Sequence, residues 1–187
     1  MKLSLSLKGY VPLCTLALTA PALSYAADMV VTAQPQEDST SPTQGYLATT
    51  SQGATKSDRP LITTPQSISV VTRQQMQDQG ALTLNQALGY SSGVFTNFGG
   101  AATRYDTISL RGFHGGDTDN TFLDGMRLMS DGGSYNVLQV DNAFLERIDV
   151  IKGPSSALYG QTVPGGLVNM VTKRPQFSEE ATSSCRP

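Results

Sequence analysis

The fold of this chain is decided by a stretch in its second half, which reads Leu145-Glu146-Arg147-Ile148-Asp149-Val150-Ile151-Lys152-Gly153-Pro154-Ser155-Ser156-Ala157-Leu158-Tyr159-Gly160. Residues 147–151 have the β-branched content of a strand. The residues before them, 142–146, can form one helical turn. Gly153 and Gly160 follow, and glycine allows positive φ and close backbone approach. Residues 167–172 then predict the last strand of the chain.

Further strands are predicted upstream of this stretch. Ser67-Ile68-Ser69-Val70-Val71 alternates and then becomes β-branched, and residues 107–110 are similarly strand-like. Two more short strands, 121–123 and 126–128, flank Asp124-Gly125. Because Asp-Gly is a strong signal for a two-residue turn, this segment predicts a β-hairpin.

A short helix is predicted directly after the strand at 67–71. Thr72 followed by Gln75 has the spacing of a capping box, in which the threonine side chain accepts a hydrogen bond from the third residue of the helix. Gly80 is a natural helix stop. These signals place the helix at residues 73–79.

A second helix is predicted to begin at Thr83, which has Gln86 at the same capping spacing. Leu84, Ala87 and Leu88 follow at helical intervals and share one face. Short helices interspersed among strands are typical of an α+β domain. We therefore expect a small α+β domain built on a mixed sheet of about four or five strands.

The amino terminus has the three parts of a secretory signal. Lys2 and Lys8 form the positive end, residues 11–23 are largely apolar, and Ser24-Tyr25-Ala26 is a small-x-small cleavage site. The predicted signal peptide is residues 1–26, with cleavage after Ala26. The protein is therefore expected to be exported.

Two segments of different character follow the signal. Asp28-Met29-Val30-Val31-Thr32-Ala33 is a short strand-like run, whereas residues 34–59 are rich in Gln, Ser, Thr, Pro and Gly. The second segment has too little apolar surface to offset the entropy of ordering it, so it is predicted to be a flexible tether. Cys14 lies within the signal, which leaves Cys185 without an internal disulfide partner.

The sequence argues against nucleic-acid binding, metal chemistry and catalysis. The formal net charge is −2, and His114 is the single histidine, which excludes two-histidine metal sites. Aspartates gather in the loops near His114, but the EF-hand glycine and glutamate are missing, so a solvated loop is favoured over a calcium site; they are Asp117, Asp119, Asp124 and Asp131. Residues 160–166 lack the Lys-Ser or Lys-Thr pair of a phosphate loop. We expect neither an enzyme nor a bound cofactor.

The opening stretch closely resembles the most characteristic segment of TonB-dependent receptor plugs. At the spacing of that family it is followed by Pro164-Gly165-Gly166-Leu167-Val168-Asn169-Met170-Val171-Thr172-Lys173-Arg174-Pro175. The resemblance extends back through Leu110-Arg111-Gly112-Phe113, the Asp124-Gly125 hairpin and residues 64–72, and covers residues 56–175. It implies a plug domain at residues 60–175 with a small mixed β-sheet of about four strands and short helices.

The resemblance also implies partners and a site of action. The run at residues 28–33 is similar to the family's TonB box, which adds as a strand to the periplasmic domain of TonB, itself driven by ExbB and ExbD. The parent receptor would take up a ferric siderophore across the outer membrane. Within the ferrichrome-like, hydroxamate-type branch, Arg111 is expected to contact the siderophore, with Ser130 and Tyr135 in the loop after the hairpin. Cobalamin and haem receptors share these signatures, so the ligand stays open.

The resemblance implies, in addition, buried ion pairs that hold the plug in its barrel. The residues proposed for them are Arg111, Glu146, Arg147 and Arg174. A salt bridge to the barrel wall and contact with the siderophore are two competing roles for Arg111. Ordinary surface charge is the alternative for the others, since buried charges are tolerated only when they are paired.

The family's 22-stranded β-barrel is not expected within 187 residues, because its strands alone would exceed this length. Residues 176–187 show no apolar alternation and include Cys185, so we expect a truncated or out-of-frame tail. Three alternatives follow: the plug part of a transporting receptor, a truncated periplasmic product that only engages TonB, or an unrelated exported domain.

Overall fold

A computed structural model of the chain describes residues 41–97, 100, 106–113, 120–128 and 138–175. The predicted signal peptide, the TonB box at residues 27–33, Ser130, Tyr135 and the tail lie outside these ranges, so these predictions stay predictions. Within the described ranges, helices are too short or too polar to cross a membrane.

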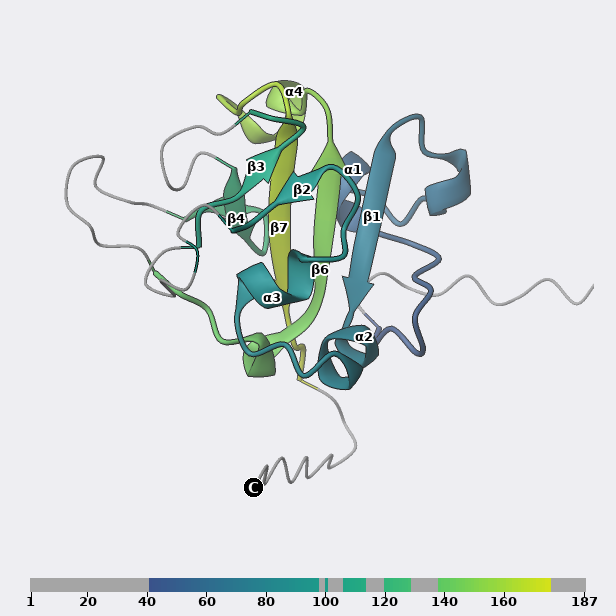
Figure 1. Cartoon of the computed structure of the whole chain (residues 1–187). Helices are drawn as coiled ribbons and strands as arrows, with labels where there is room; N and C mark the ends of the chain where they lie inside the picture. The colour runs from purple at the N-terminus through teal and green to yellow at the C-terminus, as the bar shows by residue number, and fades with distance from the viewer. Residues whose placement is uncertain (1–40, 98–99, 101–105, 114–119, 129–137, 176–187) are drawn as a thin grey trace, which may run out of the picture. The chain divides into compact units, whose positions relative to one another are not determined.

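The architecture is a five-stranded mixed sheet (Figure 1). Its strand order is β1-β6-β7-β4-β5, with β4 parallel to β7 and the other neighbours antiparallel. The strands are β1 (Ser67–Thr72), β4 (Thr121–Leu123), β5 (Met126–Arg127), β6 (Leu145–Lys152) and β7 (Gly166–Thr172). The predicted α+β class and mixed sheet are thus confirmed, as is the hairpin, in which Asp124 and Gly125 both have positive φ.

The two long central strands, β6 and β7, sort their side chains between the two faces of the sheet. Because successive side chains of a strand point to opposite faces, Ile148 and Val150 of β6 lie on one face and Asp149 and Ile151 on the other. All eight residues of β6 are buried. Both faces of this strand are therefore covered.

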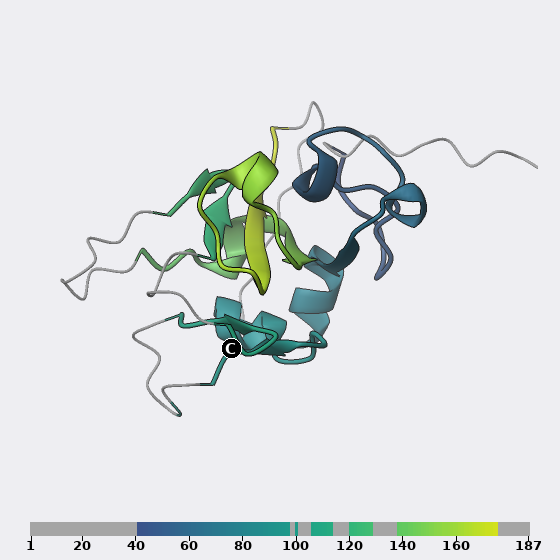
Figure 2. The same cartoon turned by 90° about the horizontal axis from the view of Figure 1, so that it is seen from above.

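One face of the sheet packs against α2 (Arg73–Asp78) and α3 (Leu84–Leu88), which begin with side-chain caps from Thr72 and Thr83 as predicted. Figure 2 shows this layer on one side of the sheet, together with the two-stranded sheet of β2 (Val94–Phe95) and β3 (Ser109–Leu110). The main apolar core lies between these layers; it comprises Val71, Met76, Ala81, Leu84, Ala87, Leu88, Ile108, Leu110, Leu128, Leu145, Ile148, Val150, Val168 and Met170.

The other face carries a second, smaller layer made of α1 (Gln52–Thr55) and α4 (Ser156–Tyr159). Phe122, Ile151 and Leu167 form a small apolar cluster there, against which Tyr159 packs. The rings of Phe122 and Tyr159 meet edge to face with centroids 5.0 Å apart. This face is therefore partly apolar near α4 and polar elsewhere.

The structure differs from the predicted tether over residues 41–59. Residues 41–59 include α1 and the buried residues Ala48, Ser51 and Ala54, and a β-bridge joins Thr50 to Pro60. The prediction failed there because it counted apolar side chains, whereas this segment is attached to the sheet through polar groups. A short 3-10 helix, η1 (Leu61–Thr63), leads from it into β1.

The boundaries around β6 also differ from the sequence-based expectation. The helical turn expected at residues 142–146 is the shorter 3-10 helix η2 (Asn142–Phe144), and β6 begins at Leu145. Glu146 and Lys152 therefore belong to the strand. Strand β2 was not predicted, since a two-residue element carries no detectable periodicity.

Gly165 and Gly166 are required by close backbone packing. A Cβ atom on Gly165 would lie 2.1 Å from the carbonyl oxygen of Leu110, and one on Gly166 would lie 2.1 Å from that of Ile151. Gly166 also has φ +131°. Gly165 therefore allows the loop that carries Arg111 to approach β7, and Gly166 allows β7 to approach the end of β6.

We predict that Gly165→Ala lowers the free energy of unfolding by about 2–4 kcal/mol, because the added methyl group must displace the Leu110 backbone. Urea denaturation of the purified chain measures the effect. The matched control is Gly89→Ala at the end of α3, where a Cβ has ordinary contacts and the free energy of unfolding should stay constant or rise by up to about 1 kcal/mol. Equal effects of the two substitutions would contradict the packing argument.

Candidate functional site

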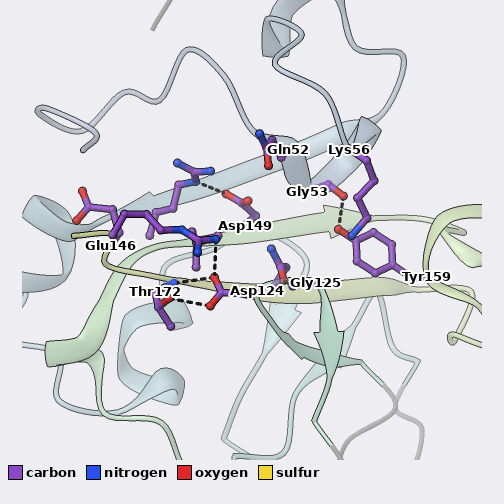
Figure 3. A pocket seen from close by; sticks show the side chains of 13 residues that line it. Gln52, Gly53, Lys56, Asp124, Gly125, Glu146, Asp149, Tyr159 and Thr172 are labelled. Carbon is purple, nitrogen blue, oxygen red and sulfur yellow. Dashed lines mark hydrogen bonds and ion pairs between the residues drawn. The ribbon is translucent and has the colours of Figure 1, made fainter. Parts of the chain in front are cut away.

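A pocket of about 170 Å³ lies where α1 meets the sheet and the turn of the β4–β5 hairpin (Figure 3). Charged side chains of both signs converge on it from distant parts of the sequence. Its charged lining residues are Lys56, Asp124, Glu146, Arg147, Asp149 and Arg174. Groups of three or more potential metal-ligating side chains are not found among the described residues.

Arg147 and Asp149 form an ion pair at the back of this pocket. They stand two residues apart on β6 and therefore on the same face, with Arg147 Nε 3.3 Å from Asp149 Oδ1. Their side chains are 4% and 0% exposed. Burial raises the pKa of Asp149, while the charge of Arg147 and a hydrogen bond from Ser51 oppose that rise.

The same carboxylate holds the start of α1. Ser51 Oγ donates a 2.8 Å hydrogen bond to Asp149 Oδ2 and accepts one from the backbone N–H of Gly53, which makes Ser51 the N-cap of the helix. A Cβ atom on Gly53 would lie 3.0 Å from Asp149 Oδ2. Ser51 and Gly53 together therefore let the helix start directly on a buried charge.

Tyr159 of α4 contacts α1 at Gly53 and also contacts Lys56, the residue that follows the helix. Its hydroxyl donates a 2.5 Å hydrogen bond to the carbonyl oxygen of Gly53, and Lys56 Nζ lies 3.8 Å from the centroid of its ring. Burial, and secondarily the charge of Asp149, raises the pKa of Tyr159 to about 12. Burial also lowers the pKa of Lys56. Figure 3 shows Lys56 and Tyr159 on the same side of Gly53.

Asp124 ties the hairpin turn to β7. Its two carboxylate oxygens accept hydrogen bonds from the backbone N–H of Thr172 at 3.0 Å and from its hydroxyl at 2.7 Å. Arg174 Nη2 lies 3.8 Å from Asp124 Oδ1, but the arginine side chain is 57% exposed, so this ion pair contributes little stability. Glu146 accepts a 3.1 Å hydrogen bond from the backbone N–H of Thr43.

A separate cationic site lies on the opposite face of the sheet. Lys152 Nζ donates hydrogen bonds to Ser69 Oγ at 2.8 Å and to Ser92 Oγ at 2.9 Å. Burial, and then the nearby charge of Arg111, lowers the pKa of Lys152. Arg111 itself is exposed and has a left-handed backbone with φ 52°. Two positive charges are therefore held close together.

The structure brings together three of the four residues predicted to form ion pairs, since Glu146, Arg147 and Arg174 line one pocket. Arg111 is not among its lining residues. Arg147 and Arg174 have acidic neighbours within the domain, and pairing of the four residues with a barrel stays a prediction. Siderophore contacts and TonB binding are likewise untested.

Sequence reasoning missed four residues that complete these sites: Ser51, Lys56, Asp149 and Lys152. A usable signal for two of them was present, because Asp149 and Lys152 are charged residues inside a strand whose neighbours are apolar. Ser51 and Lys56 had no such signal, since they lie in a segment of low complexity. The assembled groups are suited to hold segments together rather than to catalyse a reaction.

The raised pKa of Tyr159 predicts how the stability of the domain depends on alkaline pH. The folded state keeps the hydroxyl protonated up to about pH 12, whereas the usual value is 10.0. The resulting stabilisation is present below pH 10.0 and is lost as the pH rises toward 12.

Urea denaturation between pH 9 and pH 12 should therefore show a fall in stability that Tyr159→Phe reduces. Tyr90→Phe is the matched control, because Tyr90 is exposed, and this variant should keep the wild-type profile. An unchanged profile in Tyr159→Phe would contradict the assignment.

Comparison with known proteins identifies the family to which this fold belongs. The family described as TonB-dependent Receptor Plug Domain matches residues 60–167. The chain is 68% identical over 169 residues to the "Ferrioxamine receptor" of Yersinia enterocolitica, covering 90% of this chain and 24% of that protein. It is 42% identical to the "Ferrichrome outer membrane transporter/phage receptor" of Escherichia coli K12, covering 75% of this chain and 19% of that protein.

Among solved structures, the alcaligin outer-membrane receptor FauA of Bordetella pertussis superposes with a TM-score of 0.60 at 30% identity, covering 76% of this chain and 24% of the receptor. The chain thus spans about a quarter of the length of the ferrioxamine receptor and of FauA. The predicted plug fold is confirmed, and the family is one of receptors rather than enzymes. With its mixed sheet, its paired glycines at β7 and a family match over most of its described residues, the chain belongs to the TonB-dependent receptor plug domain family.

Proposed function

We propose that this chain is the plug part of a TonB-dependent receptor that takes up a ferric siderophore across the outer membrane. The observation that carries the proposal is the 68% identity to a ferrioxamine receptor over 90% of the chain. The parent receptor would act in the outer membrane, reached through export directed by residues 1–26. Iron would enter as part of its chelate and would need no ligand from the protein.

The siderophore is proposed to be a hydroxamate. Ferrioxamine and ferrichrome, which appear in the names of two similar receptors, are both ferric hydroxamate complexes. A ferrioxamine-like ligand is favoured over a ferrichrome-like one by the higher identity, 68% against 42%. Arginine suits such a ligand, since its five fixed donors match an oxygen-rich surface.

Arg111 has two candidate roles in the proposed receptor. It would contact the siderophore, together with Ser130 and Tyr135, or it would form an ion pair with an oppositely charged residue of the receptor's barrel, as would Glu146, Arg147 and Arg174. The adjacent positive charges of Arg111 and Lys152 support an anionic or oxygen-rich counterpart in either case.

The partner on the periplasmic side is proposed to be TonB, energised by ExbB and ExbD. Residues 28–33 would add as a strand to the edge of a TonB sheet, a mode in which main-chain hydrogen bonds supply the affinity. A segment near the amino terminus suits this role, because it precedes α1 and the sheet in the sequence.

We expect Val30→Pro to abolish copurification of the chain with the periplasmic domain of TonB. Proline removes a backbone donor that the added strand would need. Glu37→Pro, outside the proposed box, should copurify as well as the wild-type chain. Recovery of TonB with Val30→Pro at the wild-type level would refute the assignment of residues 28–33.

A chimeric receptor tests the transport proposal. The matching quarter of the Yersinia enterocolitica ferrioxamine receptor would be replaced by this chain and expressed in a strain that lacks ferrioxamine uptake. We expect uptake of radioactive iron from ferrioxamine, with weaker uptake from ferrichrome. Absence of uptake despite normal amounts of chimera in the outer membrane would overturn the proposal.

The same chimera separates the two roles of Arg111. If Arg111 contacts the siderophore, Arg111→Gln should raise the ferrioxamine concentration for half-maximal uptake, by roughly tenfold for the loss of a charged hydrogen bond. If Arg111 pairs with the barrel, that concentration should stay constant, while the thermal stability of the receptor falls.

A further inference from the structure

The turn of the β4–β5 hairpin is the dipeptide Asp124-Gly125. In peptides, Asp-Gly is prone to rearrange into isoaspartate, because glycine has no side chain to shield its backbone nitrogen from the neighbouring carboxyl group. The turn favours this dipeptide nonetheless: φ is 49° at Asp124 and 82° at Gly125, and a Cβ atom on Gly125 would lie 2.8 Å from Lys56 Nζ. The domain therefore carries a reactive dipeptide at a position whose backbone conformation favours it.

The rearrangement uses only the groups of the dipeptide and water. The Gly125 backbone nitrogen forms a bond to Cγ of the protonated Asp124 side chain, the amide hydrogen and the carboxyl hydroxyl leave as one molecule of water, and a succinimide ring closes. A second molecule of water then opens the ring. Breaking the bond between the nitrogen and Cγ restores aspartate. Breaking the bond between the nitrogen and the main-chain carbonyl carbon gives isoaspartate, in which the main chain runs through Cβ and Cγ.

Three groups of the turn are bound to β7. Gly125 N–H donates to Asn169 Oδ1 at 2.8 Å, and Asp124 N–H donates to the Met170 carbonyl oxygen at 2.8 Å. The carboxylate oxygens of Asp124 accept from the backbone N–H of Thr172 at 3.0 Å and from its hydroxyl at 2.7 Å. We call these four bonds the turn contacts. Both reacting groups, the Gly125 nitrogen and the Asp124 carboxyl group, are therefore held in bonds that ring closure must break.

Asn169 is itself held from the interior of the domain. It is 5% exposed and lies opposite Asp149 in the register of β6 and β7. The two side chains form a hydrogen bond. Because a carboxylate only accepts, Asn169 donates its amide N–H to Asp149 and keeps its amide oxygen for Gly125. The bond to Gly125 thus belongs to a buried network, since the side chain of Asp149 is 0% exposed.

We infer that Asp124-Gly125 is a latent isoaspartate site, and that Asn169 and Thr172 suppress its rearrangement in the folded domain. Ring closure requires the turn to leave β7, so its rate follows the fraction of molecules in which the turn contacts are open. Asn169 and Thr172 act as positioning residues, because they take no part in the bonds that form and break.

Rearrangement would release the hairpin from β7. Isoaspartate adds one carbon atom to the main chain of a two-residue turn, and the length of that turn fixes the pairing of Phe122 with Arg127. It also transfers the free carboxylate from the end of the Asp124 side chain to Cα, which changes its distance from both donors of Thr172. The modified chain would therefore lose both the register of the hairpin and the turn contacts.

Incorporation of isotopically heavy oxygen tests the inference. The full chain is incubated at about pH 5, where part of an ordinary carboxyl population is protonated, in heavy-oxygen water, and each ring opening adds one heavy oxygen. After digestion with trypsin, Asp124 lies in residues 112–127, whereas the second such dipeptide, Asp131-Gly132, lies in residues 128–147. Mass spectrometry locates the label, and the isoaspartyl form of residues 112–127 should accumulate in parallel as a separately eluting peptide.

We expect Asp124 to take up label at least about tenfold more slowly in the folded chain than in the chain unfolded in urea. In urea, Asp131 serves as the internal reference, because both dipeptides have the same sequence and should react at similar rates. Equal rates at Asp124 in the folded and unfolded chains would overturn the inferred suppression.

Removing one of the turn contacts should raise the rate in the folded chain. Thr172→Val deletes the hydroxyl bond to Asp124, and Asn169→Ala deletes the bond to Gly125. Each should accelerate labelling of Asp124 by roughly three- to tenfold, the factor expected for one hydrogen bond. In urea each should label at the wild-type rate. Circular dichroism checks folding, and Thr172→Val decides the outcome if Asn169→Ala does not fold.

Val171→Ala is the matched control, because Val171 lies on β7 between the same residues and forms none of the turn contacts. It should label Asp124 within about twofold of the wild-type rate. Wild-type rates in folded Thr172→Val and Asn169→Ala would overturn the role of the turn contacts. An acceleration by Val171→Ala as large as theirs would also overturn it, since the cause would then be a general loosening of β7.

Discussion

The pairing of Arg147 with Asp149 inside β6 is the constraint on which this structure depends. The strand is covered on both faces, so each charged side chain on it must find a partner without help from water. Removing one member of a buried pair typically costs about 3–5 kcal/mol, because the other charge is left uncompensated. The charges of Arg147 and Asp149 therefore determine which groups can pack against this face of the sheet.

Several other features follow from that constraint. Asp149 accepts a hydrogen bond from Ser51, which caps α1 and thereby orders a segment whose buried apolar side chains are Ala48 and Ala54. Gly53 has to lack a side chain because the helix begins against the carboxylate. On the opposite face, Lys152 is satisfied by two serines, while Arg111 adds a second positive charge. The two faces thus have different roles, since one holds residues 43–59 and the other carries the cations Lys152 and Arg111.

Much of the architecture could be read from local patterns. The caps at Thr72 and Thr83, the hairpin at Asp124-Gly125 and the alternation in β1 depend on residues close together in the sequence, and all of them are present in the structure. Residues 41–59 were misjudged as part of a tether because their order depends on Asp149 and Tyr159, about a hundred residues away. The amino-acid composition of a segment carries no information about contacts with residues so distant in the sequence.

The α+β class, the paired glycines and the signature stretch from Leu145 to Gly160, through which the family could be recognised, are all legible in the order of the residues. Which charged side chains meet became visible in the folded domain alone. Glu146, Arg147 and Arg174 gather in one pocket with Asp149, while Arg111 lies with Lys152 on the other face. The physical reason is that strand periodicity assigns each side chain to a face, whereas strand order and register decide which residues lie opposite one another.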